Sequence, residues 1–107
     1  MDFDQGHTSR GFAVMGFTDF YGHRCSVQKS SLATKDAIWL GVNDADPQIM
    51  ASDAKEHGVK TNLITGWIPY PIPDAVQLTT RMHLTQEQVQ ELLPILMYFA
   101  NTGELPV

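Results

Sequence analysis

The segment RCSVQKSSLATKDAIWLG, residues 24–41, joins an alternating stretch to a continuous apolar run. In residues 24–30 apolar side chains alternate with polar ones, which is the pattern of a strand with one buried face. Residues 37–42 are apolar almost throughout, so they predict a more deeply buried strand with Trp39 in its core. The serines and lysines between them break the pattern. Two strands linked by a polar connection are the starting point for the fold.

The flanking segments extend this sheet. Residues 11–20 are rich in aromatic and β-branched side chains, and Gly22 marks a turn before residue 24, so a hairpin is expected. Residues 76–84 alternate again and predict a fourth strand. The sequence therefore indicates a small, mainly antiparallel β-sheet of about four strands.

The C-terminal segment has the pattern of an amphipathic helix. Thr85 and Gln88 fit a capping box at its start, and Gly103 lies where a helix-ending glycine is expected. Pro94 removes one helical hydrogen bond and predicts a kink. The helix carries more apolar surface than one core face requires. Either a second copy of the chain or the long connection at 43–66 would cover the excess.

The order of elements places the chain in the α+β class, with the antiparallel sheet packed against one C-terminal helix kinked at Pro94. A length of 107 residues fits a single domain, 1–107. Residues 1–10 are polar and are expected to form a flexible arm. Residues 43–66 are expected to form a long loop or insert. The alternate prolines of residues 67–73 fit an extended edge segment.

Composition narrows the class of function. Seven Lys and Arg face twelve Asp and Glu, for a net charge of −5, whereas a general nucleic-acid binder usually carries a basic surplus. Cys25 is the one cysteine, so an internal disulfide is excluded and a buried, reduced thiol is expected. The first residues do not resemble a signal peptide, and no apolar run has membrane length. We expect a cytoplasmic protein without membrane association.

The sequence contains no pattern typical of catalysis or metal binding. The four histidines lack the i, i+4 spacing of a zinc site, and residues 43–47 lack the later glycine and glutamate of a calcium loop. No acid is placed to orient a histidine beside Cys25. Phosphate-loop glycines are absent. We therefore expect neither an enzyme nor a cofactor or metal site.

A cluster of cations is the most informative chemical feature. Arg24, Lys29 and Lys35 are three of the seven cations within twelve residues. If residues 76–84 pair near residues 24–30, guanidinium groups, hydroxyls and a helix N-terminus would meet, as in a phosphate site. The candidate ligand-binding residues are Arg24, Gln28, Lys29, Ser30, Ser31, Arg81, His83 and Thr85. The alternative is a solvated strand face.

One member of this set is ambiguous by position. Lys29 shares the parity of Cys25 and Val27 in the predicted strand, so regular alternation directs it away from the other polar residues. Only a strand that ends before Lys29, or a bulge that redirects it, would place it in the anion pocket.

Residues 17–41 and 79–105, about half of the chain, resemble small proteins of tailed bacteriophages. The shared blocks are CSVQKSSLA followed by IWLG, and TRMHLTQEQVQELLP followed by TGEL. This resemblance implies a phage protein in the cytoplasm of an infected bacterial host, and small phage proteins of this kind include anti-defence factors. It transfers no catalytic residue.

Three functions fit that context. The first is an oligomeric sponge that sequesters a small anionic immune signal, either a cyclic nucleotide or an NAD-derived molecule of the ADP-ribose type. The second is an inhibitor that binds a bacterial defence protein, as anti-CRISPR proteins do. The third is an accessory of phage structure or assembly. The cation cluster and the apolar helix favour the sponge and a homo-oligomer.

Overall fold

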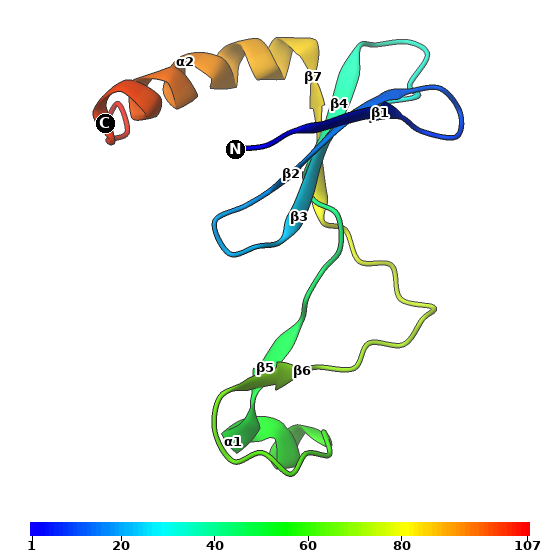
Figure 1. Ribbon diagram of the computed structural model, residues 1–107, viewed down its shortest axis with the longest axis vertical. Coiled ribbons are helices and arrows are strands. Elements are labelled where there is room, and N and C mark those ends of the chain that lie inside the picture. The colour runs from blue at the N-terminus through cyan, green and yellow to red at the C-terminus, as the bar shows by residue number, and fades with distance from the viewer. The chain divides into compact units, whose positions relative to one another are not determined.

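The computed structural model describes all residues, 1–107, and the chain divides into two compact units (Figure 1). The first unit combines Met1–Asn43 with Thr80–Val107, and the second is Asp44–Thr79. The second unit is therefore inserted between two elements of the first. Thr80 Oγ1 donates to the Asn43 carbonyl at 3.4 Å, so the two residues that flank the insertion meet within the first unit.

The first unit is built on a five-stranded antiparallel sheet followed by a C-terminal helix, which confirms the α+β class. The strand order is β1-β2-β3-β4-β7. The strands are β1 (Asp4–His7), β2 (Ala13–Thr18), β3 (Arg24–Lys29), β4 (Ala37–Val42) and β7 (Arg81–Thr85). The fifth strand arises because β1 lies within the N-terminal segment that was expected to be a flexible arm.

The hairpin between β2 and β3 forms as its sequence predicts. Gly22 has φ +88°, and its amide donates to the Asp19 carbonyl at 3.1 Å. The Asp19 carboxylate also accepts from the amides of Tyr21 and His23, each at 2.9 Å. These bonds stabilise the ionised form, with the His23 amide contributing most, and they lower the pKa of Asp19.

The helix α2 (Gln86–Thr102) begins and ends where the sequence predicts. Thr85 Oγ1 accepts from the Gln88 amide at 3.2 Å, and the Gln88 side chain accepts from the Thr85 amide at 3.0 Å. Gly103, with φ +76°, closes the helix by donating to the Phe99 carbonyl at 2.7 Å. The helix is continuous through Pro94, and the kink stays a prediction. No helix of the chain has both the length and the apolar character needed to cross a membrane.

The two faces of the main sheet differ in character, because successive side chains of a strand point to opposite sides. The apolar face carries Met15, Phe17, Cys25, Val27, Lys29, Ile38, Leu40, Met82 and Leu84. The polar face carries Arg24, Ser26, Gln28, Trp39, Gly41, Arg81 and His83. The hydroxyls and charged groups that could bind a ligand are thus concentrated on one face.

The second unit contains the segment 43–66, apart from its first residue, that was expected to be a long loop or an insert. It contains β5 (Gln48–Met50), α1 (Ala51–Ala54), the 3₁₀ turn η1 (Lys55–His57) and β6 (Trp67–Pro69). Its small core consists of Ala51, Ala54 and Ile68, with Ile49 and Val59 packed against them. The strand β6 pairs only with β5, so its proline lies on an edge strand, where a missing amide donor is tolerated.

Candidate functional site

A glycine gap allows an arginine to cross the polar face of the sheet. Ser26, Gly41 and Arg81 are aligned on β3, β4 and β7. Because Gly41 has no side chain, the Arg81 side chain extends over β4, and its Nη1 donates to Gln28 Oε1 at 2.9 Å and to Ser26 Oγ at 3.3 Å. A Cβ on Gly41 would lie 2.9 Å from the Thr80 carbonyl oxygen, so the close approach of β7 requires glycine here.

An aromatic pair lies beside this arginine. Trp39 and His83 are opposite each other on β4 and β7, and their rings are parallel within 6° with centroids 3.9 Å apart. The Arg81 guanidinium carbon lies 5.8 Å from the Trp39 ring centroid, which is within cation–π range. The His83 Nε2 atom is 2.9 Å from Ser30 Oγ. Two rings and one cation are therefore held together on β4 and β7.

Two buried serines hold these groups in place. Ser26 and Ser30 are each only 4% exposed, and each has its hydrogen-bonding partners. Ser26 Oγ donates to Asn43 Oδ1 at 2.7 Å, and Ser30 Oγ accepts from the Leu32 amide at 3.2 Å. Buried polar groups are costly unless they are paired, so this network fixes the positions of the side chains that bond to it.

Arg81 differs from the other cations of the strands because no carboxylate pairs with it. Arg24 donates to Asp4 at 2.6 Å, and Lys29 to Asp36 at 2.9 Å. The partners of Arg81 are neutral, namely the Ser26 hydroxyl and the Gln28 carbonyl oxygen. Its positive charge is therefore oriented but not neutralised, and it remains able to form charge-assisted hydrogen bonds.

We call the set of Ser26, Gln28, Ser30, Trp39, Arg81 and His83 the Arg81 cluster. It contains four of the residues predicted from the sequence, Gln28, Ser30, Arg81 and His83. They meet although β7 pairs with β4 and not with β3, because the long side chains reach over β4.

The other four predicted residues lie outside the cluster. Arg24 is on the same face but is bound to Asp4 and Thr18. Ser31 follows the end of β3 and is exposed. The Thr85 hydroxyl is engaged in the helix cap.

Lys29 is placed on the opposite face by the regularity of its strand. It pairs with Ile38 at the end of β3, without a bulge, so it shares the apolar face with Cys25. Alternation thus decides the ambiguity left by the sequence, and Lys29 lies outside the predicted anion pocket.

The sequence assigned the wrong environment to Trp39. It was expected in the core because it lies in an apolar run, but it is half-buried on the polar face between Gln28 and His83. Ser26 has the same parity as Arg24, Gln28 and Ser30, and alternation places it on their face as a neutral donor, but it was not among the eight candidate ligand-binding residues.

The Arg81 cluster offers an uncompensated guanidinium, hydroxyl and amide groups, and an aromatic stack at the edge of the sheet. Together these groups can bind a planar ring and an adjoining negative charge. Comparison with known protein families, with curated protein sequences and with solved structures finds no match for the chain.

Proposed function

We propose that the protein binds a small anionic ligand of the nucleotide type at the Arg81 cluster and acts by sequestering it. In the phage context suggested by the sequence resemblance, the ligand is an immune signal, either a cyclic nucleotide or an NAD-derived molecule of the ADP-ribose type. The protein would then be an anti-defence sponge, working as a homo-oligomer in the cytoplasm of the infected bacterium and needing no catalysis.

The observation that carries this proposal is the environment of Arg81. Its guanidinium is fixed by two neutral acceptors beside the Trp39 ring, and no carboxylate competes for it. A phosphate would find a charge-assisted donor there, of a kind that binds phosphate bidentately.

His83 supplies the surface for a base. It is exposed, and β7 is the edge strand, so one ring face is covered by Trp39 while no further strand lies beyond it. The Arg81 guanidinium lies over β4, 5.8 Å from the centroid of the Trp39 ring on which His83 stacks, so a ligand with its base on His83 would reach the guanidinium across Trp39.

Tryptophan fluorescence can test the proposal directly. The chain has two tryptophans, and Trp67→Phe leaves Trp39 as the single reporter next to the cluster. Cyclic dinucleotides, cyclic trinucleotides and cyclic ADP-ribose isomers would be titrated into this variant. We expect saturable quenching by one class of ligand. We also expect thermal stabilisation, equivalent to about 2.7 kcal/mol at one hundred times the Kd.

Paired charge variants locate the site. Arg81→Ala removes the uncompensated cation and is expected to abolish binding, whereas Lys29→Ala removes the same charge from the opposite face and is expected to leave binding intact. Equal effects of the two variants, or no binding across the whole panel, would refute the proposal. Co-purification of a bacterial defence protein with a chain that binds no nucleotide would favour the inhibitor instead.

A further inference from the structure

The C-terminal half of α2 is apolar but uncovered. Residues 92–103 contain no charged side chain and no histidine. Six large side chains in this half are between 41% and 57% exposed: Leu93, Ile95, Leu96, Met97, Tyr98 and Phe99. No residue of α2 is buried. A helix that is apolar around most of its circumference normally lies inside a protein, so this helix lacks a neighbour.

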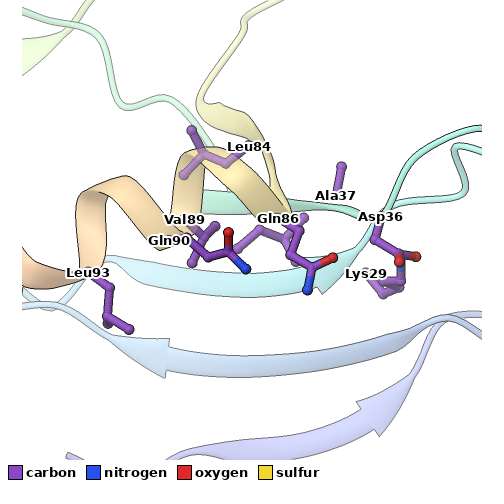
Figure 2. A pocket seen from close by; sticks show the side chains of 9 residues that line it. Lys29, Asp36, Ala37, Leu84, Gln86, Val89, Gln90 and Leu93 are labelled. Atoms are coloured by element: carbon purple, nitrogen blue, oxygen red, sulfur yellow. The ribbon is translucent and has the colours of Figure 1, made fainter.

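A groove lies between the first turns of α2 and the apolar face of the sheet (Figure 2). Its volume is about 300 Å³. The sheet contributes Ala37, Ile38 and Leu84, and the helix contributes Val89 and Leu93. Polar side chains, including Lys29 and Gln90, lie among the lining residues. On the same face of the sheet, Met15 and Met82 are 38% and 53% exposed.

We propose that these two surfaces cover each other in a symmetric dimer, in which α2 of a second copy packs along the groove and the apolar sheet face. This inference names the interface of the homo-oligomer in the proposed function and in that respect rests on it. The helix that covers the groove and the apolar sheet face must itself have an uncharged apolar surface. Residues 92–103 of this chain have that property. A two-fold arrangement would cover both exposed surfaces of both copies at once.

The available apolar area matches what a stable dimer needs. A standard interface buries about 800 Å² on each partner, of which roughly 60% is apolar, or about 480 Å². The eight exposed side chains of α2 and the sheet are each about half exposed. Together they offer roughly 400–550 Å² of apolar surface per copy.

A membrane surface fits this helix less well than a second copy does. Helices that bind anionic lipid carry Lys and Arg on their polar side. The charged residues of α2 are Glu87 and Glu91, and the helix contains no Lys or Arg. Carboxylates would be repelled by an anionic bilayer, whereas they can remain at the solvated rim of a protein interface.

The test measures the mass of the full-length chain by light scattering and sedimentation equilibrium between 1 and 100 μM. These concentrations are chosen around a roughly micromolar Kd, typical of modest interfaces. We expect twice the mass of the 11.9 kDa chain, or a multiple of that dimer. Leu96→Glu and Phe99→Glu each place a charge in the interface and are expected to raise the Kd of the dimer at least tenfold.

Glu91→Gln is the matched control, since it changes the charge of the same helix by one unit on its polar side and is expected to keep the wild-type mass. Far-UV circular dichroism establishes that each variant is folded. A wild-type chain that remains monomeric at the highest concentration overturns the inference without any variant. A dimer that is equally stable with Leu96→Glu overturns the assignment to α2. Arg81→Ala is expected to stay dimeric, so loss of the dimer and loss of ligand binding can be distinguished.

Discussion

Gly41 provides the sharpest test of how the sheet is assembled. It has φ +147°, and a Cβ in Gly41→Ala would lie 2.9 Å from the Thr80 carbonyl oxygen and 3.1 Å from Arg81 Cα. Both of these are backbone atoms and cannot rotate away. The disfavoured dihedral costs about 1–3 kcal/mol. The forced shift of β7 costs about 1–3 kcal/mol more. We therefore expect a loss of about 2–6 kcal/mol in the free energy of unfolding, and a fall in Tm of about 10 °C or more.

Two other glycines provide graded controls. In Gly16→Ala the nearest atom is Arg24 Nη2 at 2.7 Å, the mobile end of an exposed side chain. Its displacement sacrifices at most the ion pair with Asp4, worth about 0–1 kcal/mol. Gly6→Ala meets nothing within 4 Å and is expected to be neutral or stabilising by a few tenths of a kcal/mol.

Urea unfolding of the three variants, followed by far-UV circular dichroism, measures this order. A free energy of unfolding for Gly41→Ala within about 0.5 kcal/mol of the wild-type value, the size of an ordinary surface substitution, would refute the steric role of Gly41. A Gly16→Ala variant as destabilised as Gly41→Ala would refute it too, because then the flexibility of the neighbouring atom would not matter.

Three further predictions follow from local features. Thr85→Ala removes the cap of α2 and is expected to lower the free energy of unfolding, measured in urea, by about 1 kcal/mol. Thr85→Ser keeps the capping hydroxyl and should retain most of the wild-type stability. The lowered pKa of Asp19 means that its ionised form stabilises the fold above its ordinary pKa of 3.8. This contribution is lost as pH falls through the lowered value, so Asp19→Asn should flatten the Tm profile there, and an unchanged profile would contradict it. Replacing residues 44–79 by a short Gly/Ser linker should leave the main sheet folded by circular dichroism, because Asn43 and Thr80 are already in contact; an unfolded product would show that the sheet depends on the insertion.

The sequence predicted those parts of the fold whose interactions are local. The Thr85–Gln88 box, the Gly22 turn and the Gly103 helix end each connect residues a few positions apart, so their chemistry is visible in a short window. The order of the strands in the sheet could not be predicted in this way. Pairing of β7 with β4 joins segments on either side of the whole second unit, and no local pattern identifies that partner.

The candidate site was predicted to the extent that it depends on alternation. Parity alone puts Gln28 on the polar face and Lys29 on the apolar one. Trp39 was misplaced because hydrophobicity does not reveal which face of the sheet an aromatic ring occupies. Its position on the polar face is set by the strand register, which places it between Gln28 and His83.

The insertion of Asp44–Thr79 between β4 and β7 also has a consequence for biosynthesis. Strands β1 to β4 form a meander that can fold as it leaves the ribosome, but the outer edge of β4 has no partner until β7 is made. At 5–20 residues per second, the second unit delays that partner by roughly two to seven seconds. For this interval the nascent chain presents an unpaired edge with the sequence AIWLGV, the kind of surface on which growing chains associate wrongly. The yield of native protein should therefore depend on translation speed and chaperone supply within this window.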